Sequence, residues 1–312
     1  MKEAAPRCWK RPVCFLGVAP FYVKPPKFIG GKLADIDRTN TRMAAFGGFQ
    51  DAVKRVIHTQ SSFTAFNQKS KRVLYPTKPK SSVQKVPVLG GTPITADTAL
   101  ALRRQVFGSA DLLGSTENEW LGQSFVFHDG ETVEAYSLKM HKTSTKGLAM
   151  CVQGFILKHL LFNRRGARVV ADPTVLLRAT TKAQEEALVG ALSDILWRAG
   201  ERQHAVLCLA QENIYVNDTP SYQSDGCTER IHTFEFKKQD ELTFNLKKYL
   251  FEFLADEGNG LLLFLYSLVL SRGFNKLNED MGGEEVSLLC TNSIIHPSLA
   301  TLMLTGRATL FL

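Results

Sequence analysis

The chain has 312 residues, which is enough for one large domain or two ordinary ones. With 44% hydrophobic and 22% charged residues, its composition is that of a globular protein and argues against a fully disordered or fibrous one. The net charge of +8 is unevenly spread, because residues 1–95 hold 17 Lys and Arg against 4 Asp and Glu, whereas residues 96–312 hold 21 against 26. A basic N-terminal arm, net +13, is thus joined to a mildly acidic domain, net −5.

Neither a signal peptide nor a membrane span is expected. The N-terminus has only a short apolar run, Val13 to Ala19, which Gly17 interrupts. The longest later run, Leu261 to Leu270, falls well short of the roughly 20 residues that cross a bilayer. The 6 cysteines form no C-x-x-C pair, which argues against a zinc ribbon and against a disulfide framework. We expect an intracellular protein of the cytoplasm, the nucleus or both, neither secreted nor transmembrane, with no metal and no cofactor.

Residues 1–94 are predicted to be a basic, largely disordered and flexible region, because they are rich in proline, lysine, serine and threonine and show little periodicity. One short helix is a candidate within this region, at residues 41–58, although Gly47 and Gly48 weaken it. A basic arm of this kind can bind nucleic acid or an anionic membrane. The alternative is a solvated linker without a partner.

An ordered domain is predicted over residues 95–312. It should open with a helix that Asp97 caps and Gly108 ends. In residues 119–136, apolar and polar residues alternate around a His-Asp-Gly turn, a pattern typical of a hairpin or of paired strands. Residues 147–162 place apolar side chains at helical spacing and predict a central helix with a wide apolar face.

The second half of the domain mixes helices and strands, which makes the fold class α+β. The turn-rich stretch 216–229 is predicted to be an exposed loop. The acidic stretch 278–285 lacks the spacing of a calcium-binding loop and is also predicted to be a solvated loop. The expected strands are 205–210 and 231–236, and the expected helices are 182–199, which Gly200 ends, 240–253 and 260–271.

Three separated stretches of the domain resemble one protein family. They are RRQVFGSADLLGSTENEWLGQSFVFHDG, GLAMCVQGFILKHLLF and ALVGALSDILWRAGERQHAVLCLA. They are similar, in that order, to three parts of the MINDY deubiquitinases: an FGS segment followed by a W-x-x-Q-S-F-x-F strand, the helix that follows the nucleophile, and an A-D-I-x-W-R-A-G element. The resemblance runs along most of residues 98–306 and is closest to the branch that contains the family's fourth member.

This resemblance implies an α+β, cysteine-protease-like catalytic domain of the MINDY type. Members of the family are cysteine isopeptidases that prefer lysine-forty-eight-linked polyubiquitin, and their nucleophile lies in a segment resembling Q-N-x-G-G-P-C-G. The corresponding segment here is MHKTSTKG, residues 140–147. When the two are aligned on the Val-Gln-Gly of the following helix, the nucleophile position falls on Lys146. The position of the glutamine that supports the oxyanion falls on Met140.

Both replacements predict a loss of catalysis. A helix N-terminus lowers the pKa of a thiol but repels the positive charge of a lysine such as Lys146. Methionine cannot donate a hydrogen bond to an oxyanion, so Met140 by itself implies a loss of ~10²–10³ in rate. The family's histidine, in an E-S-H-F segment, is expected to be missing from a C-terminally shortened domain that ends at Leu312, and His296 is interpreted as a surface or helix-capping residue. The chain is therefore predicted to be an inactive paralogue of its branch.

Three hypotheses about function follow. The first is a pseudo-deubiquitinase, an inactive ubiquitin carboxyl-terminal hydrolase that still binds ubiquitin, polyubiquitin or another partner. The second is an active deubiquitinase that uses Cys151, although Cys151 should face the core, where burial raises a thiol pKa. The third is that the basic arm tethers the chain to nucleic acid or to an anionic membrane. The loop with Met140 and His141 is either an altered binding groove or an ordinary loop.

Overall fold

The computed structural model of the chain describes residues 85–108, 119–140, 143–163, 172–256, 258–283, 286–290 and 294–310. They belong to one compact unit that spans residues 76–312. Most of the arm predicted over residues 1–94, with its candidate helix at 41–58, lies outside the described residues. In the part that is described, the fold is a mixture of helices with one small sheet, as the α+β prediction required.

The sheet has the order β1-β3-β2 and is antiparallel throughout. The predicted strands are confirmed as β2 (Ala205–Ala210) and β3 (Ile231–Phe236), and Cys208 pairs with Thr233 in their register. The two-residue strand β1 (Thr92–Pro93) was not predicted, because two residues are too few to show an alternating pattern. It covers only the beginning of the outer edge of β3.

Helix α9 (Gly260–Arg272) covers the other edge of the sheet and confirms the prediction of a buried helix. The backbone N–H of Val206 donates to Ser271 Oγ at 2.9 Å and that of Cys208 donates to Ser267 Oγ at 2.8 Å. The N–H groups of Val206 and Cys208 point away from β3, and two serines one helical turn apart accept their hydrogen bonds. Among the described helices, none combines the length and apolarity that crossing a membrane requires.

The first helix of the domain, α2 (Ala96–Phe107), has the predicted end but a different cap. Gly108 ends it in the left-handed conformation, with φ 86°. The prediction that Asp97 caps the helix is wrong, because Thr95 is the N-cap and its side chain accepts a hydrogen bond from the N–H of Thr98 at 3.3 Å. Asp97 lies in the first turn, where its charge still complements the helix dipole.

The predicted central helix is confirmed but begins four residues earlier than expected. It forms α4 (Thr143–Lys158) and continues as a π-helical turn, η1 (His159–Asn163). Leu148, Val152 and Ile156 recur at helical spacing and are fully buried, which is the wide apolar face that the sequence indicated. Lys146 therefore lies inside the first turn of α4 and not before it.

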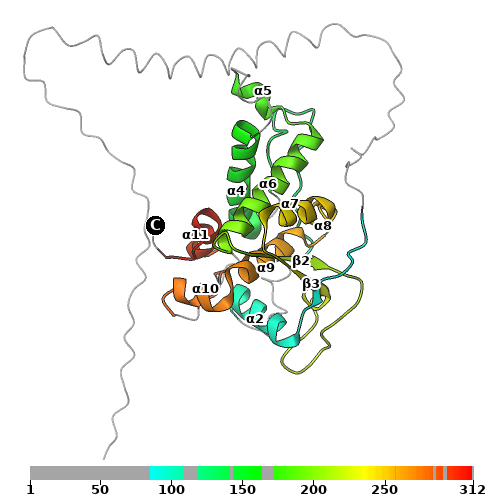
Figure 1. The fold of residues 1–312 in the computed structure, drawn as a ribbon, viewed down its shortest axis with the longest axis vertical. Helices are drawn as coiled ribbons and strands as arrows, with labels where there is room; N and C mark the ends of the chain where they lie inside the picture. The colour runs from blue at the N-terminus through cyan, green and yellow to red at the C-terminus, as the bar shows by residue number, and fades with distance from the viewer. Residues whose placement is uncertain are drawn as a thin grey trace, which may run out of the picture. The chain divides into compact units, whose positions relative to one another are not determined.

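Helix α6 (Thr181–Ala199) packs beside α4, with α5 (Pro173–Leu177) beyond their upper ends and α11 (Pro297–Thr305) across their lower ends (Figure 1). The predicted limits of α6 are confirmed, since Gly200 caps its C-terminus. An added Cβ at Gly190 would lie 2.6 Å from the ring of His159, so this glycine lets η1 approach α6 closely.

Asp194 joins η1 to α6 through its carboxylate. It accepts hydrogen bonds from Lys158 Nζ at 2.7 Å and contacts His159 Nε2 at 3.0 Å, and Gln239 Nε2 donates to it at 3.2 Å. Partial burial raises the pKa of Asp194, but the hydrogen bonds and charges of His159 and Lys158 outweigh it and hold the pKa well below its usual range.

The Asp194→Asn variant should therefore lose stability in a pH-dependent way. Because the folded-state pKa is depressed, the stabilisation is complete above the unfolded pKa of about 4 and is lost as the pH falls below it. We expect a deficit of about 1–2 kcal/mol at pH 6 that shrinks as the pH falls below about 4. Urea unfolding at several pH values measures it, with the exposed Asp256→Asn as control. A deficit that stayed constant down to pH 3 would contradict this assignment.

Two predicted elements are interrupted. The single helix expected over residues 240–253 is two helices, α7 (Gln239–Lys248) and α8 (Phe251–Leu254), because Tyr249 and Leu250 turn into the core between them. The hairpin or paired strands expected over residues 119–136 do not form as regular strands, because that stretch makes one isolated antiparallel bridge, between Phe127 and Leu138. Two backbone hydrogen bonds flank the bridge, from the N–H of His128 to the carbonyl of Ser137 at 3.0 Å and from the N–H of Lys139 to the carbonyl of Val126 at 2.6 Å, so the pairing is short.

The stretch 216–229 was predicted to be an exposed loop, which is wrong for its second half. Arg103 of α2 is 2% exposed and places Nη2 2.7 Å from the Asp225 carboxylate, which is fully buried. Its Nη1 donates to the carbonyl of Gln223 at 2.6 Å, and its guanidinium lies 4.4 Å from the ring centre of Tyr222. The loop is thus folded onto α2 around a buried ion pair, and it ends in a 3₁₀ turn, η2 (Thr228–Arg230).

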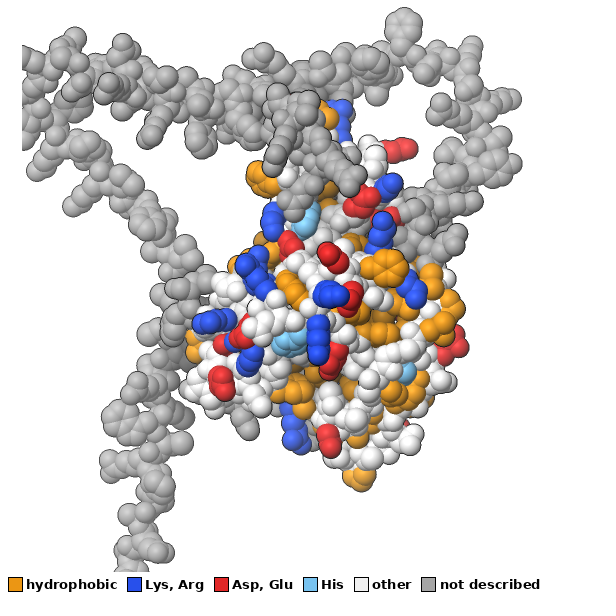
Figure 2. Space-filling model, in the orientation of Figure 1, with side chains coloured by type: hydrophobic (Ala, Val, Ile, Leu, Met, Phe, Trp, Pro, Cys, Tyr) orange, Lys and Arg blue, Asp and Glu red, His pale blue; other side chains and the backbone are white. Residues whose placement is uncertain are grey.

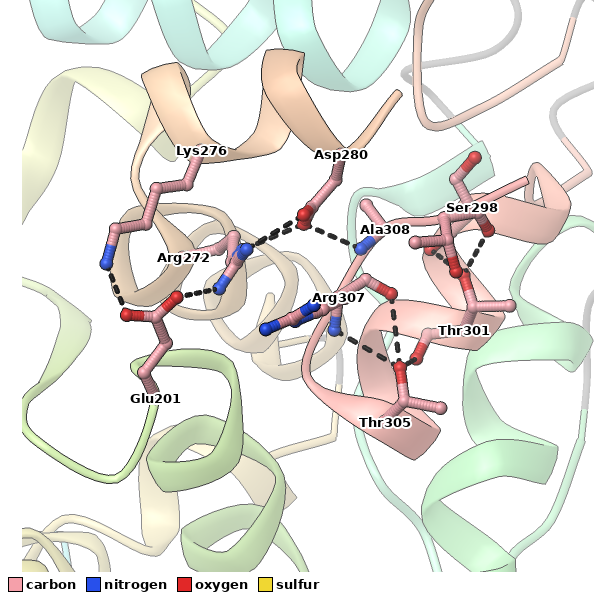
Figure 3. Close-up of polar contacts among 10 residues, drawn as sticks. Glu201, Arg272, Lys276, Asp280, Ser298, Thr301, Thr305, Arg307 and Ala308 are labelled. Carbon is pink, nitrogen blue, oxygen red and sulfur yellow. Dashed lines mark hydrogen bonds and ion pairs between the residues drawn. The ribbon is translucent and has the colours of Figure 1, made fainter. Parts of the chain in front are cut away.

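The acidic stretch 278–285 was predicted to be a solvated loop, but its first part closes helix α10 (Phe274–Asp280). Asp280 accepts two hydrogen bonds from Arg272, both at 2.8 Å, and a third from the backbone N–H of Ala308 (Figure 3). Arg272 also bonds Glu201, which binds Lys276 in turn. This chain of charges fixes the segment after α11 against α10 and α9.

Charges of both signs are interspersed over the described part of the face in Figure 2, with hydrophobic side chains between them. Such mixing is typical of an ordinary solvated surface. The excess negative charge of the domain is therefore not concentrated in one patch on this face.

Candidate functional site

The site predicted from the sequence lies where α4 begins, beside an extended segment that carries Gln123 and Ser124. This segment is fixed onto the start of α9: Asn259 Oδ1 accepts from the N–H of Gly122 at 2.9 Å, and the carbonyl of Gln123 accepts from the N–H of Leu261 at 3.0 Å. The N–H of Phe125 donates to the carbonyl of Phe253 at 2.9 Å. At the start of α9, the N–H of Leu261 is thus satisfied by this backbone, and the N–H of Gly260 donates to Ser124 Oγ at 3.3 Å.

Gln153 of α4 holds the chain that leads to Met140. Its Oε1 accepts from the N–H of Leu138 at 2.8 Å, and its Nε2 donates to the carbonyl of Tyr136 at 3.0 Å. The amide side chain of Gln153 thus satisfies one backbone N–H and one backbone C=O of this segment, as a neighbouring strand would. The family resemblance includes Gln153 but assigns it no role. Its partner Leu138 lies 15 residues earlier, and a contact over that distance leaves no local pattern in the sequence.

A small pocket separates these two segments from α4. Its volume is about 10 Å3, which is room for about one water molecule. Met140 and Gln123 line it together with Thr145 and Ala149 of α4. The structure therefore brings the predicted oxyanion position, Met140, to the first turn of α4. His141, its neighbour in the predicted loop, lies outside the described residues.

Lys146 follows directly after Thr145 and is exposed to solvent. As the fourth residue of α4, it carries its positive charge in the turn where unpaired N–H groups concentrate the positive end of the helix dipole. Thr145 is buried beside the pocket, and Ser144 is 2% exposed with an Oγ that has no hydrogen-bond partner among the described residues. Of Ser144, Thr145 and Lys146, only Lys146, the predicted nucleophile position, is exposed.

Cys151, the rival nucleophile, lies on another side of the same helix. Five residues separate it from Lys146, which corresponds to a rotation of about 140° around the axis and an advance of about 7.5 Å. It is partly buried and packs against the hydrophobic core. Burial raises the pKa of the Cys151 thiol, so the reactive thiolate is disfavoured. These observations agree with the interpretation of Cys151 as a core residue.

His296 is confirmed as a helix-capping residue. It is the N-cap of α11, and its Nδ1 accepts a hydrogen bond from the N–H of Ser298 at 3.2 Å. Burial lowers the pKa of His296, which keeps the ring neutral and able to accept this bond. Among the residues that the structure describes, no group of three or more His, Cys, Asp and Glu side chains could hold a metal ion.

Comparison with known proteins places the sequence in a family. Residues 103–312 match the family described as "Deubiquitinating enzyme MINDY-3/4, conserved domain". The relatives include proteins called "Probable ubiquitin carboxyl-terminal hydrolase MINDY-4", one from Bos taurus that is 30% identical over 230 residues and one from Homo sapiens that is 29% identical over 216 residues. These matches cover 74% and 69% of this chain.

A third relative with the same name, from Xenopus tropicalis, is 29% identical over 218 residues, or 70% of this chain. The chain spans less than a third of each relative's length, since the matches cover 28–29% of the three proteins. No protein of solved structure matches the chain. Because the family match covers more than half of the sequence, the chain belongs to the MINDY-3/4 family of deubiquitinating enzymes.

Proposed function

We propose that the chain carries a pseudo-deubiquitinase domain, a MINDY domain that binds ubiquitin or polyubiquitin without hydrolysing it. The observation that carries this proposal is Lys146, an exposed lysine in the first turn of α4 at the place where the family resemblance puts the nucleophile. A lysine supplies no thiol at this position, and the positive field that favours a thiolate at a helix N-terminus does not favour an ammonium group. Hydrolysis would then need a different nucleophile.

Met140, which lines the small pocket, also supports the proposal. A thioether offers no N–H or O–H to a developing oxyanion, whereas a glutamine at this position would. Gln123 also lines the pocket and could donate a hydrogen bond, but it faces a space of about 10 Å3, too small for a peptide tail without rearrangement. The pocket is better suited to exclude a scissile bond than to activate one.

Family membership supports the finer features of the proposal. The domain, residues 95–312, would have a cysteine-protease-like fold, and its ligand would be polyubiquitin of the lysine-forty-eight linkage. It would act inside the cell, in the cytoplasm or nucleus. A role of the basic arm as a tether to nucleic acid or membrane remains a prediction, since residues 1–84 lie outside the described ranges.

The proposal is tested with ubiquitin whose C-terminus carries an electrophile that traps active-site thiols. The full chain should form no adduct under reducing conditions, because its candidate thiol, Cys151, is partly buried and has a raised pKa. An active family member serves as the positive control, and mass spectrometry identifies any modified residue. Adduct formation on Cys151, abolished by Cys151→Ser, would overturn the proposal in favour of an active enzyme.

A further inference from the structure

A second and much larger groove lies on the other side of the segment that walls the small pocket. Its volume is about 420 Å3, within the range of pockets that bind ligands. It runs between the extended segment Phe125–Gly130, the first turn of α6 and helix α8. Phe125 and Lys139 line both the groove and the small pocket, so the two hollows share one wall.

The walls of the groove are held by hydrogen bonds, so it does not depend on a mobile loop. Gln184 of α6 is buried and donates through Nε2 to the carbonyls of His128 and Ala135, at 2.9 and 2.6 Å. On the facing strand-like segment, the N–H of Lys139 donates to the carbonyl of Val126 at 2.6 Å. A ligand would therefore meet a preformed surface and lose little affinity to ordering of the protein.

The groove has an acidic rim. Asp129, Glu185 and Asp256 line it, one from each of its three walls, and Asp129 and Asp256 are exposed. The lysine among the lining residues, Lys139, already lies 3.9 Å from the Asp129 carboxylate. The excess of negative charge disfavours nucleic acid, phosphate and carboxylate ligands and attracts cationic ones.

The floor of the groove is apolar and partly uncovered. Phe127, Phe251 and Leu254 line it and are half-buried. Their remaining exposed surface can be removed from water only by an apolar group of a ligand, since the carboxylates stand at the rim. The combination selects a ligand with positive charges beside an aliphatic or aromatic side chain.

We propose that this groove binds a basic peptide segment of a partner protein, one in which lysine or arginine side chains flank an apolar residue. The apolar side chain covers Phe127, Phe251 and Leu254, and the cations bind the exposed carboxylates of Asp129 and Asp256. This site is separate from the nucleophile position and does not depend on whether the domain hydrolyses or binds ubiquitin.

The experiment measures binding of a fluorescein-labelled hexapeptide of alternating lysine and leucine to the full chain by fluorescence anisotropy. A hexapeptide of alternating glutamate and leucine is the counter-probe. The double variant Asp129→Lys/Asp256→Lys reverses two exposed charges on the rim. The matched control, Glu235→Lys/Glu279→Lys, makes the same change in net charge at exposed residues that do not line the groove.

We expect the rim variant to bind the lysine peptide at least about tenfold more weakly than the unmodified chain, and the control variant to bind it within about twofold. The affinity should also fall as salt is raised. Thermal unfolding followed by circular dichroism verifies that both variants are folded. The proposal is overturned if both variants lose affinity equally, if the glutamate peptide binds as well as the lysine peptide, or if the lysine peptide does not bind at 1 mM protein, roughly the weakest affinity of interest.

Discussion

Replacing Arg103 with alanine should lower the free energy of unfolding by about 3–5 kcal/mol, the usual result of leaving one partner of a buried ion pair alone. Arg103 and Asp225 are almost completely buried. Burial alone would raise the pKa of Asp225, but hydrogen bonds from Thr228 and the charge of Arg103 outweigh it and hold the pKa below its usual range. Without the guanidinium, the carboxylate must either stay charged in the core or take up a proton.

The neighbouring residue provides the control. Arg104 lies next to Arg103 in α2 but is exposed, so Arg104→Ala should change stability by no more than about 0.5 kcal/mol. Urea unfolding of both variants at neutral pH gives the comparison. Neutralising both partners, in Arg103→Met/Asp225→Asn, should recover part of the loss, because no unpaired charge remains and the amide oxygen still accepts from the N–H groups of Cys227 and Thr228. Equal stability of Arg103→Ala and Arg104→Ala would show that the buried pair does not hold the loop.

The Lys146→Cys variant should gain a thiol that is unusually reactive, because α4 still presents the field that lowers a thiol pKa at a helix N-terminus. We expect alkylation by iodoacetamide at pH 7 to be about three- to tenfold faster than at an exposed cysteine in the middle of a helix. A lower thiol pKa raises the fraction of thiolate at pH 7 but makes each thiolate somewhat less nucleophilic, so the expected gain in rate is modest. Peptide-resolved mass spectrometry separates this thiol from the native cysteines.

Met150→Cys is the matched comparison for this measurement. Met150 lies one turn further along α4 and is 55% exposed, so it shares the helix and the solvent but not the unpaired N–H groups of the first turn. Equal alkylation rates at the two engineered cysteines would mean that the nucleophile position has lost its activating field. In that event the charge of Lys146 would no longer explain why this position disfavours catalysis.

Much of the fold could be predicted from local patterns. Gly200 and Gly108 end helices where a glycine is expected, and the alternation of Ile231 to Phe236 marks a strand that the structure confirms. These signals are local because helix ends and strand faces depend on neighbours within a few residues. The errors occurred where distant residues decide the structure, as at Asp225, whose partner Arg103 is more than 100 positions earlier.

The candidate site was predicted only in part. The family resemblance placed Met140 beside α4, and the structure brings it to the wall of the small pocket. The roles of Gln153 and Gln123 were missed, since both depend on tertiary contacts with no signature in their own segments. Asp129 and Asp256 were also missed as members of one groove, because their closeness depends on how α8 packs and not on sequence spacing.

Incubation of the full chain with long lysine-forty-eight-linked ubiquitin chains, beside an active family member, tests the central proposal most directly. Both the cleavage of the chains and their retention on the immobilised protein are measured. We predict retention without cleavage, since the Lys146 position supplies no thiolate and Met140 supplies no oxyanion donor. Cleavage that a mutation in this chain abolishes would contradict the proposal and return Cys151 to consideration as the nucleophile.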